Sequence, residues 1–588
     1  MTSMNRNTPL ILIALLLISG LPGKLFSQNP LFIPDTLSGT TFNLNIQKGT
    51  TVFYPGHNTN TLGYNGAFLG PTLFMNKGDS VTLNVKNTLP VENSTVHWHG
   101  FHLPAKWDGG PYQLIAPNVT WSPKFKVLNK AATYWYHAHQ HMKTEIQVSK
   151  GLAGMIIIRD SEEAGYNLPR HYKVDDFPLI VQTRIFDPFY QIGSATHEDT
   201  ALMVNGTLRP YLQVPKQVVR FRMLNGSADR SYEFGLSDNS SFFMIASDGG
   251  LLAQPYSTNR LRLSPGERAE ILINFGNYTL GQSLYLMSYA SELPKGIIGA
   301  DSVGTSTLLI QDGYYQNLLN GNNFNVLRFD VIAPTANPVT TIPASFAPIP
   351  YIPSSPVDAT QKLNFSPDFG TSGQQALVDG PFFINNRTFH MDSMNIKTYL
   401  GNTEIWTLTN KTLVAHSFHI HDIQFFILDI NHNPPPPELS GYKDVVLVEP
   451  DDTIRFITKF DDFMDPTVPF MYHCHLLHHE DDGMMGTFLV LDSTNHTINV
   501  PENYVGQDGM KIYQNFSENE LLIKINSDKS TASAIYITDI LGKVQKTVFN
   551  GLISKGENEF KLSIADLSSG IYLVVYNGTH QQRVKIIR

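Results

Sequence analysis

Short segments that alternate between apolar and polar residues recur along the whole chain, and they limit the folds that it can adopt. Examples are residues 80–85 (SVTLNV), 270–274 (EILIN) and 443–448 (KDVVLV), separated by turns rich in Gly, Pro, Asn and Asp. Period-two alternation is typical of strands with one buried face. No long amphipathic helix stands out. The pattern therefore predicts an all-β protein built from β-sandwiches.

The chain is expected to fold as several domains, because 588 residues are too many for one hydrophobic core. A proline-rich stretch over about 332–357 predicts an extended linker. A second boundary is expected near 492–506. The expected parts are sandwiches at 29–165, 173–315 and 360–495, a linker over 316–359, and a smaller β domain at 511–588.

The first 27 residues have the layout of a secretory signal. Arg6 precedes the apolar run 10–21, and cleavage is expected just after Ser27. The alternative is a membrane anchor, but the run is short for a spanning helix. The chain is thus expected to be exported, with passage through the periplasm. Its net charge of −9 is modest and it has no basic patch, which argues against a nucleic-acid partner.

The chain has one cysteine, Cys474, so an exported form cannot contain an internal disulfide. The thiol is then an inert core group, half of an intermolecular bridge, or a metal-bound thiolate. A histidine stands on each side of it, which favours the metal-bound form. Cys474 is therefore the first candidate metal ligand.

Eight of the 20 histidines form four His-x-His pairs, two in the first expected sandwich and two in the third. Residues two apart on a strand point to the same face, so each pair can offer two imidazoles to one metal cluster. One such pair is compatible with chance or with a single zinc site, but four pairs favour copper, which imidazole suits. Eight imidazoles could serve three coppers and leave room for bound oxygen. The pairs are His97/His99, His137/His139, His419/His421 and His473/His475.

The sulfur of Cys474 is expected to point away from that cluster, since the histidines on either side of it share the opposite face of the strand. His416 stands three positions before the third pair and should also point to the sulfur side, if the strand is regular there. His479 and Met484 follow the cysteine, within reach of a loop that curls back. Two histidines, a cysteine and a weak methionine form the ligand set of a blue-copper electron-transfer site.

Four segments around these residues resemble the copper signatures of the three-domain multicopper oxidases, a family that includes laccases and bacterial cuprous oxidases. The similarity extends over about 40–495 and includes DGGP at 108–111 and GYKD at 441–444. The four segments are HWHG at 97–100, WYHAH at 135–139, HSFHIH at 416–421 and HCHLLHHEDDGM at 473–484.

The resemblance implies three cupredoxin-like Greek-key sandwiches and four copper ions, with a type 1 copper in the third sandwich and a trinuclear cluster between the first and third. The type 1 ligands would be His416, Cys474, His479 and Met484. The type 2 ligands would be His97 and His419. The type 3 pair would be bound by His99, His137, His139, His421, His473 and His475. All twelve positions carry the expected residue type.

The resemblance also implies an activity in which electrons taken one at a time from a reductant pass through Cys474 to the cluster, where dioxygen is reduced to water. Protons must reach the cluster as well. Asp108 matches the family position for a carboxylate in this role, and Glu480 is a second candidate catalytic residue. The alternative for each acid is a solvated turn residue.

Several features near the candidate ligands are expected to have supporting roles. His102, His141 and His478 are expected to surround the site or lie on the surface without binding metal. The middle sandwich has no cysteine and is expected to be a copper-free spacer. Its turns at 205–206 and 265–268 (PGER) resemble the second domain of the family.

The reducing substrate is less constrained than the copper chemistry. Cuprous oxidases of the family usually carry a methionine-rich insert, with acidic or methionine residues just before the first type 1 histidine. Here that approach is KTLVA at 411–415, and only Met391 and Met394 suggest a soft-metal contact, with ordinary packing as their alternative. This favours phenols or aromatic amines over Cu(I) as the reductant. The protein is also expected to be a monomer.

Two other function classes remain open at this stage. One is a cupredoxin electron carrier or copper-binding protein that does not reduce dioxygen. Such a protein needs only the blue site, so the eight paired histidines argue against it. A two-domain copper nitrite reductase would not require all four histidine pairs. Oxygen uptake with a reductant separates an oxidase from a carrier.

Residues 511–588 again have the pattern of short strands. LSSGIY at 567–572, followed by the basic and apolar end VKIIR at 584–588, resembles the type IX secretion sorting domain. This implies a secretion machinery as partner and a secreted or cell-surface location. The alternative is an accessory β-sandwich that binds carbohydrate or another surface partner.

Overall fold

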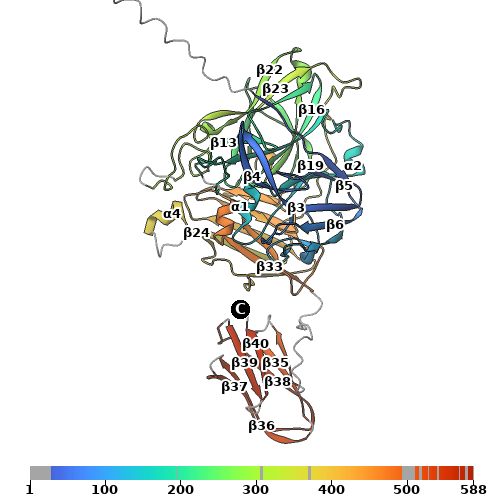
Figure 1. Cartoon of the computed structure of the whole chain (residues 1–588). Helices are drawn as coiled ribbons and strands as arrows, with labels where there is room; N and C mark the ends of the chain where they lie inside the picture. The colour runs from blue at the N-terminus through green and yellow to red at the C-terminus, as the bar shows by residue number, and fades with distance from the viewer. Residues whose placement is uncertain are drawn as a thin grey trace, which may run out of the picture.

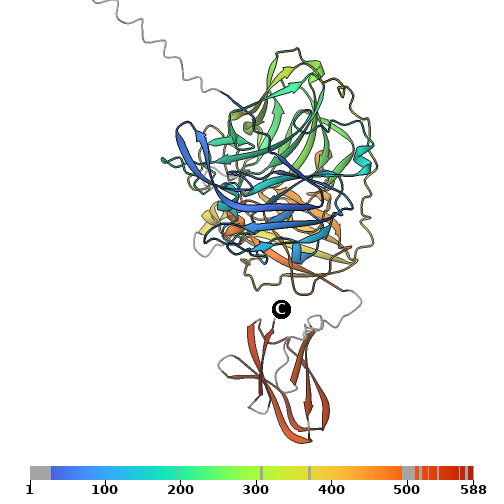
Figure 2. The ribbon, with the colours of Figure 1, turned by 45° about the vertical axis from the view of Figure 1, so that its right-hand side comes forward.

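The computed structural model describes three β-sandwiches packed into one body and a separate C-terminal β domain (Figures 1 and 2). The described residues are 28–194, 197–304, 309–367, 373–492, 510–515, 520–527, 529–539, 542–568, 570–576 and 580–586. The expected secretory signal lies outside them. Within these ranges, no helix has the length and apolar character needed to cross a membrane. The expected all-β class is confirmed.

The first sandwich consists of two five-stranded sheets, one in the order β2-β5-β11-β10-β7 and one in the order β4-β3-β6-β8 with β9 beside β6. Its core contains Trp98 and Tyr136, whose rings lie on the face opposite the histidines of their strands. The elements are β2 Thr36–Ser38, β3 Thr41–Tyr54, β4 His57–Tyr64, β5 Thr72–Asn76, β6 Ser80–Asn87, β7 His97–His99, η1 Ala105–Trp107, β8 Thr120–Trp121, β9 Lys124–Lys126, β10 Ala132–His137, α1 Thr144–Ser149, β11 Ala153–Arg159 and α2 Ser161–Ala164.

The middle sandwich pairs a six-stranded sheet, β1-β15-β23-β22-β17-β20, with a seven-stranded sheet, β14-β13-β12-β16-β21-β18-β19. Its elements are β1 Asn29–Pro30, β12 Asp176–Arg184, β13 Ala201–Val204, β14 Thr207–Leu208, β15 Pro210–Pro215, β16 Val218–Asn225, β17 Tyr232–Leu236, β18 Phe242–Ser247, β19 Gly250–Thr258, β20 Leu261–Leu263, β21 Arg268–Asn274, η2 Phe275–Asn277, β22 Ser283–Tyr289, η3 Ala290–Glu292 and β23 Asn323–Ile332.

Two of these strands lie outside the range expected for the middle domain. Asn29–Pro30 stands at the expected start of the first domain but pairs in parallel with β15. Asn323–Ile332 falls in the expected linker but forms β23, between β15 and β22. Its alternating apolar residues Leu327, Phe329 and Val331 are buried in the middle core, which outweighs the loop character of the neighbouring prolines. The middle sandwich therefore extends to Ile332.

The third sandwich consists of the sheets β25-β24-β27-β31-β29 and β26-β33-β32-β28-β30. In the second sheet β32 lies between β28 and β33, and both of its faces are buried. The elements are β24 Ala359–Pro367, η4 Gly373–Gln375, α4 Ala376–Asp379, β25 Phe382–Ile384, β26 Ile396–Tyr399, β27 Thr403–Asn410, β28 His416–Ile420, β29 Phe426–Ile430, η5 Pro437–Leu439, β30 Val445–Val448, β31 Thr453–Lys459, β32 Phe470–Cys474, α5 Leu477–Asp481 and β33 Met485–Leu491.

The C-terminal domain has a three-stranded sheet, β34-β35-β38, and a four-stranded sheet, β37-β36-β39-β40. Its own small core includes Ile523, Ile537 and Val574. The strands are β34 Met510–Asn515, β35 Glu520–Ser527, β36 Thr531–Asp539, β37 Val544–Ile553, β38 Gly556–Ser563, β39 Gly570–Tyr576 and β40 His580–Ile586.

Candidate functional site

Eight histidines gather where the first and third sandwiches meet. Figure 1 shows these two sandwiches in blue and orange. The histidines are the members of the four His-x-His pairs, and each is at most 1% exposed. Antiparallel pairing places His97 of β7 opposite His137 of β10, and His419 of β28 opposite His473 of β32. Strand register therefore brings residues far apart in the sequence into one buried cluster.

Three of these imidazoles converge through their Nε2 atoms. The Nε2 atom of His139 lies 3.3 Å from those of His421 and His473, which are 3.2 Å from each other. Nitrogen lone pairs this close repel one another unless a proton or a metal cation lies between them. The arrangement suits one metal ion bound by three imidazoles.

A second group of three imidazoles lies beside the first. The Nδ1 atom of His99 is 3.4 Å from the Nε2 atom of His137, and the ring of His475 lies 4.9 Å and 5.5 Å from their rings. Both ring nitrogens of His475 are buried without a hydrogen-bond partner. Buried polar atoms of this kind are rare in folded proteins, so a ligand for them is expected.

His97 and His419 complete the cluster. Their Nδ1 atoms bond to backbone carbonyl oxygens, of Asp108 at 3.0 Å and of Asp444 at 2.8 Å. These bonds require the Nδ1–H tautomer and leave each Nε2 atom as a lone-pair donor. Both Nε2 atoms are buried without a partner, which again suits a metal ion.

Two buried carboxylates contact the outer nitrogens of the cluster. The carboxylate oxygens of Glu480 lie 3.1 Å from Nδ1 of His139 and of His473. The Asp108 carboxylate accepts a 2.6 Å hydrogen bond from Nδ1 of His421 and lies 3.3 Å from Nδ1 of His97. Both sequence-predicted acids are thus buried against the histidines and are not solvated turn residues. Asp108 orients the ring of His421 by a hydrogen bond, and the other three imidazoles lie within ion-pair distance of a carboxylate.

The charge state of Asp108 follows from the same contacts. Burial alone would raise the pKa of the carboxyl group, but His421 and His97 outweigh burial and hold the pKa well below its usual value. The group is therefore a carboxylate at neutral pH, the form that accepts the hydrogen bond from His421.

The other side of β32 carries the sulfur. The Cys474 Sγ atom lies 3.6 Å from Nδ1 of His416 and 3.7 Å from Nδ1 of His479. The backbone N–H of Cys474 donates to the carbonyl of Met484, whose side chain is fully buried in the same apolar core. The structure thus brings Cys474, His416 and His479 together, and Met484 lies in the same core. These four residues are called the sulfur pocket below.

Protonation in this pocket favours metal binding by the histidines. Burial, aided by the charge of His478, lowers the pKa of His416 to about 3, so its imidazole is neutral. Burial raises the pKa of the Cys474 thiol, so a bound cation would have to displace its proton.

Two side chains that contact these histidines were not singled out from the sequence. The Oγ1 atom of Thr412 lies 2.8 Å from Nε2 of His416, and is also 2.8 Å from the Oδ1 atom of Asn410, to which it donates. The hydroxyl can then accept from His416 Nε2–H, which leaves Nδ1 free toward the sulfur. Phe382 packs on the rings of His416 and His479, at 4.8 Å and 4.6 Å. An isolated Thr or Phe gives no sequence signal for such a role.

The remaining neighbouring histidines lie beside the site. His102 lies between Asp422 at 3.1 Å and Asp462 at 2.9 Å. Burial opposes its charge, but Asp422 and Asp462 outweigh burial and raise the pKa of His102 to about 10. His478 pairs with the middle-domain residue Asp229 at 2.6 Å. The third, His141, packs edge-on against Phe389.

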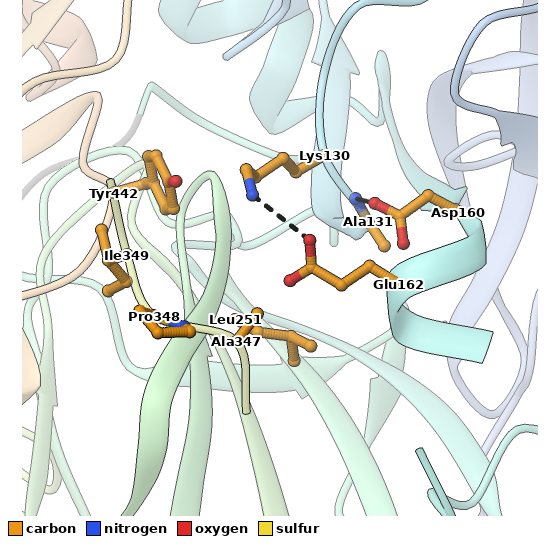
Figure 3. A pocket seen from close by; sticks show the side chains of 9 residues that line it. All are labelled: Lys130, Ala131, Asp160, Glu162, Leu251, Ala347, Pro348, Ile349 and Tyr442. Carbon is orange, nitrogen blue, oxygen red and sulfur yellow. Dashed lines mark hydrogen bonds and ion pairs between the residues drawn. The ribbon is translucent and has the colours of Figure 1, made fainter. Parts of the chain in front are cut away.

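A small hollow lies apart from the histidines, where the first and middle sandwiches meet the proline-rich segment (Figure 3). Lys130 and Glu162 face each other across it at 3.5 Å, and Tyr442, Pro348 and Ile349 line another side. None of the twelve candidate ligands lines this hollow, so the histidine chemistry takes place elsewhere.

Comparison with protein families agrees with this geometry. Multicopper oxidase models match residues 45–163, 134–313 and 355–494. The chain is 33% identical over 462 residues to the multicopper oxidase mco of Staphylococcus haemolyticus, covering 76% of this chain and 88% of the relative. The chain belongs to the multicopper oxidase family. It is therefore an oxidoreductase with copper cofactors, and its sandwiches are cupredoxin-like.

Solved structures of the family share the fold. A laccase-like multicopper oxidase CueO from Ochrobactrum sp. aligns with a TM-score of 0.68 at 31% identity, covering 79% of this chain and all of the other. The McoA multicopper oxidase of Aquifex aeolicus aligns with a TM-score of 0.69 at 29% identity, with the same coverage. The cell division protein FtsP of Escherichia coli is 30% identical, covering 79% of this chain and 93% of the relative. The relatives of this chain therefore include a protein whose name refers to cell division.

Residues 511–587 match a secretion system C-terminal sorting domain. The predicted resemblance of the last domain to the type IX sorting domain is therefore confirmed. The multicopper oxidase of this chain is attached to a domain that directs export.

Proposed function

We propose that this multicopper oxidase binds four coppers, oxidises phenols or aromatic amines one electron at a time, and reduces dioxygen to water. The single observation that carries the proposal is the division of side chains around Cys474. Its sulfur joins one candidate metal group, while His473 and His475 on either side of it join another.

The proposed ligands follow from the three imidazole groups and the sulfur pocket. A type 1 copper would be bound by His416, Cys474, His479 and Met484. A type 2 copper would be bound by His97 and His419. One type 3 copper would be bound by His139, His421 and His473, and the other by His99, His137 and His475. The partnerless Nε2 atoms of His97 and His419 support these sites, because each is a buried lone-pair donor with no proton or cation to bind it.

The protein's contribution would be geometry and proton supply. Bound copper supplies the one-electron redox steps and the site for dioxygen. The backbone from Cys474 to each flanking histidine gives electrons a short covalent path between the two sites. Glu480 and Asp108 hold the imidazoles and can pass protons to oxygen. Four electrons and four protons then convert one dioxygen to two waters.

Packing around the sulfur pocket supports a reductant that transfers its electron without binding the copper. His416 and His479 are at most 3% exposed, and Phe382, itself 2% exposed, packs on both rings. Of the two methionines that suggested a soft-metal contact, Met394 has its sulfur 3.9 Å from the hydroxyl of Thr487 on β33. For Met391 only the backbone oxygen is engaged, as acceptor from Tyr112. A Cu(I) or other metal-ion oxidase in copper tolerance is the second candidate, supported by the exposed side chain of Met391.

The full set of eight buried imidazoles argues against a non-catalytic copper carrier, which would need only the sulfur pocket. We further propose that the chain acts as a monomer. Its signal would carry it to the periplasm, and its sorting domain would carry it onward to the medium or the cell surface.

The substrate proposal is tested by oxygen uptake. Copper-loaded protein should consume dioxygen with a substituted phenol at a higher kcat/KM than with Cu(I). The reverse order would assign the protein to the cuprous oxidases. No uptake with either reductant, from protein that holds four coppers, would make it a carrier.

Replacing Asp108 by Asn should slow reoxidation of the reduced enzyme by dioxygen about 100-fold, the usual size of a lost acid–base contribution. The blue absorption should stay intact, because Asp108 contacts no residue of the sulfur pocket. Stopped-flow mixing with dioxygen measures the rate. Asp482→Asn, an exposed acid near Glu480, is the matched control. Equal rates in Asp108→Asn and the native protein would remove Asp108 from the mechanism.

Deleting 511–588 should leave copper-loaded, active oxidase in the periplasm, because the sorting signal is lost and the catalytic sandwiches have their own cores. Oxidase activity measured in periplasmic extract and in medium reports the location. Secretion of the truncated form at the native level would contradict the proposed role of this domain.

A further inference from the structure

The middle sandwich reaches the histidine cluster through the turn between β20 and β21. The Oγ atom of Ser417 donates to the carbonyl of Pro265 at 2.8 Å and lies 2.9 Å from the Oγ atom of Ser264. Ser417 stands on β28 two residues before His419. The turn is therefore bonded directly to a strand that carries candidate ligands.

Gly266, at the tip of this turn, lies against His475. Its φ is +88°, and a Cβ atom there would stand 3.0 Å from the Cγ and Cδ2 atoms of the His475 ring. A contact of 3.0 Å is tighter than nine in ten real Cβ contacts, and a positive φ also disfavours a side chain. The backbone at Gly266 therefore limits how far the His475 ring can move.

Arg268, two residues further on, contacts all three sandwiches. Its guanidinium is fully buried and donates two 2.6 Å hydrogen bonds to the carboxylate of Asp444 in the third sandwich. It also donates to the carbonyl of Thr133 in the first sandwich, at 3.2 Å. Gly100 leaves the space, since a Cβ atom there would stand 2.6 Å from both Arg268 and Asp444. A bidentate pair of this kind fixes the carboxylate in one orientation.

Asp444 connects Arg268 to two candidate ligands. One of its carboxylate oxygens lies 3.2 Å from Nε2 of His99, and its backbone carbonyl accepts from Nδ1 of His419. With Nε2–H directed to the carboxylate, His99 presents Nδ1 toward His137. The carboxylate that Arg268 holds thus selects the ring nitrogen that His99 offers to the cluster.

We propose that Arg268 and Gly266 are positioning residues of the trinuclear copper site, which makes the middle sandwich a working part of that site. The inference rests on the proposed assignment of copper to the eight imidazoles. Arg268 acts through Asp444 on His99, and Gly266 acts on His475. Both histidines belong to the same proposed type 3 copper.

The competing explanation is that Arg268 is simply a buried ion pair that stabilises the fold. Arg222 in the same sheet provides the comparison. It is 1% exposed and donates to both oxygens of Asp176, at 2.8 Å and 2.9 Å, and to Glu270 at 2.6 Å. The partner Glu270 also accepts hydrogen bonds from Arg220 and Thr133, neither of which is a candidate copper ligand. If Arg268 had only a structural role, the same substitution at Arg222 and at Arg268 would have equal effects.

The first test compares Arg268→Lys with Arg222→Lys. Each change keeps the charge but removes the bidentate geometry. Arg268→Lys should keep the blue type 1 absorption and lose the type 3 absorption, with about 10- to 100-fold weaker binding of cluster copper in competition with a chelator. Arg222→Lys should keep native copper content and both absorptions. Native copper binding in Arg268→Lys, or equal losses in both variants, would overturn the proposal.

A second pair of variants covers the case in which Arg268→Lys does not fold. Gly266→Ala adds a methyl group against His475, while Gly281→Ala adds one at a similar φ of +80° into open space. Loss of the type 3 absorption with retained blue absorption in Gly266→Ala alone supports the proposal, and equal spectra in both variants contradict it. The native protein is the reference. If the native protein does not bind four coppers, the proposed function is wrong. If the native protein binds four coppers and the variants are unaffected, only this inference is wrong.

Discussion

The alternation of side chains along β32 and the residue after it is the constraint on which the site depends. Cys474 lies in the apolar core of the third sandwich with Tyr472, while His473 and His475 face the first sandwich. Because the peptide backbone is shared, the two candidate metal groups are held at a distance set by covalent geometry. Sequence changes elsewhere can alter the surroundings of each group, but they leave this spacing intact.

The cluster also requires three sandwiches to meet. The first and third supply the imidazoles, and the carboxylates Asp108 and Glu480 each bridge histidines of both. The middle sandwich supplies Arg268, a buried charge that is paired with Asp444 of the third sandwich and donates to the carbonyl of Thr133 in the first. Breaking one such pair leaves an unpaired buried charge, which is strongly unfavourable. The contacts that hold the sandwiches together are therefore also contacts of the candidate metal site.

The sequence predicted what depends on local periodicity. The all-β class, the grouping of His416 and His479 around Cys474, and the acids Asp108 and Glu480 all follow from spacing or from the family motifs. It did not predict the link from Arg268 to Asp444, since these residues are 176 positions apart and only the packing of two domains joins them. It also placed β23 in a linker, because proline-rich sequence nearby masked a strand whose partners lie in the middle sandwich.

The division of ligands around Cys474 is tested most directly by anomalous diffraction at the copper absorption edge, on crystals of the copper-loaded protein. We expect one anomalous peak bonded to the Cys474 sulfur and three further peaks among the eight imidazoles, with His473 and His475 on different type 3 coppers. A cysteine sulfur without copper, or the sulfur and its two neighbouring imidazoles bound to one common ion, would contradict this division of ligands.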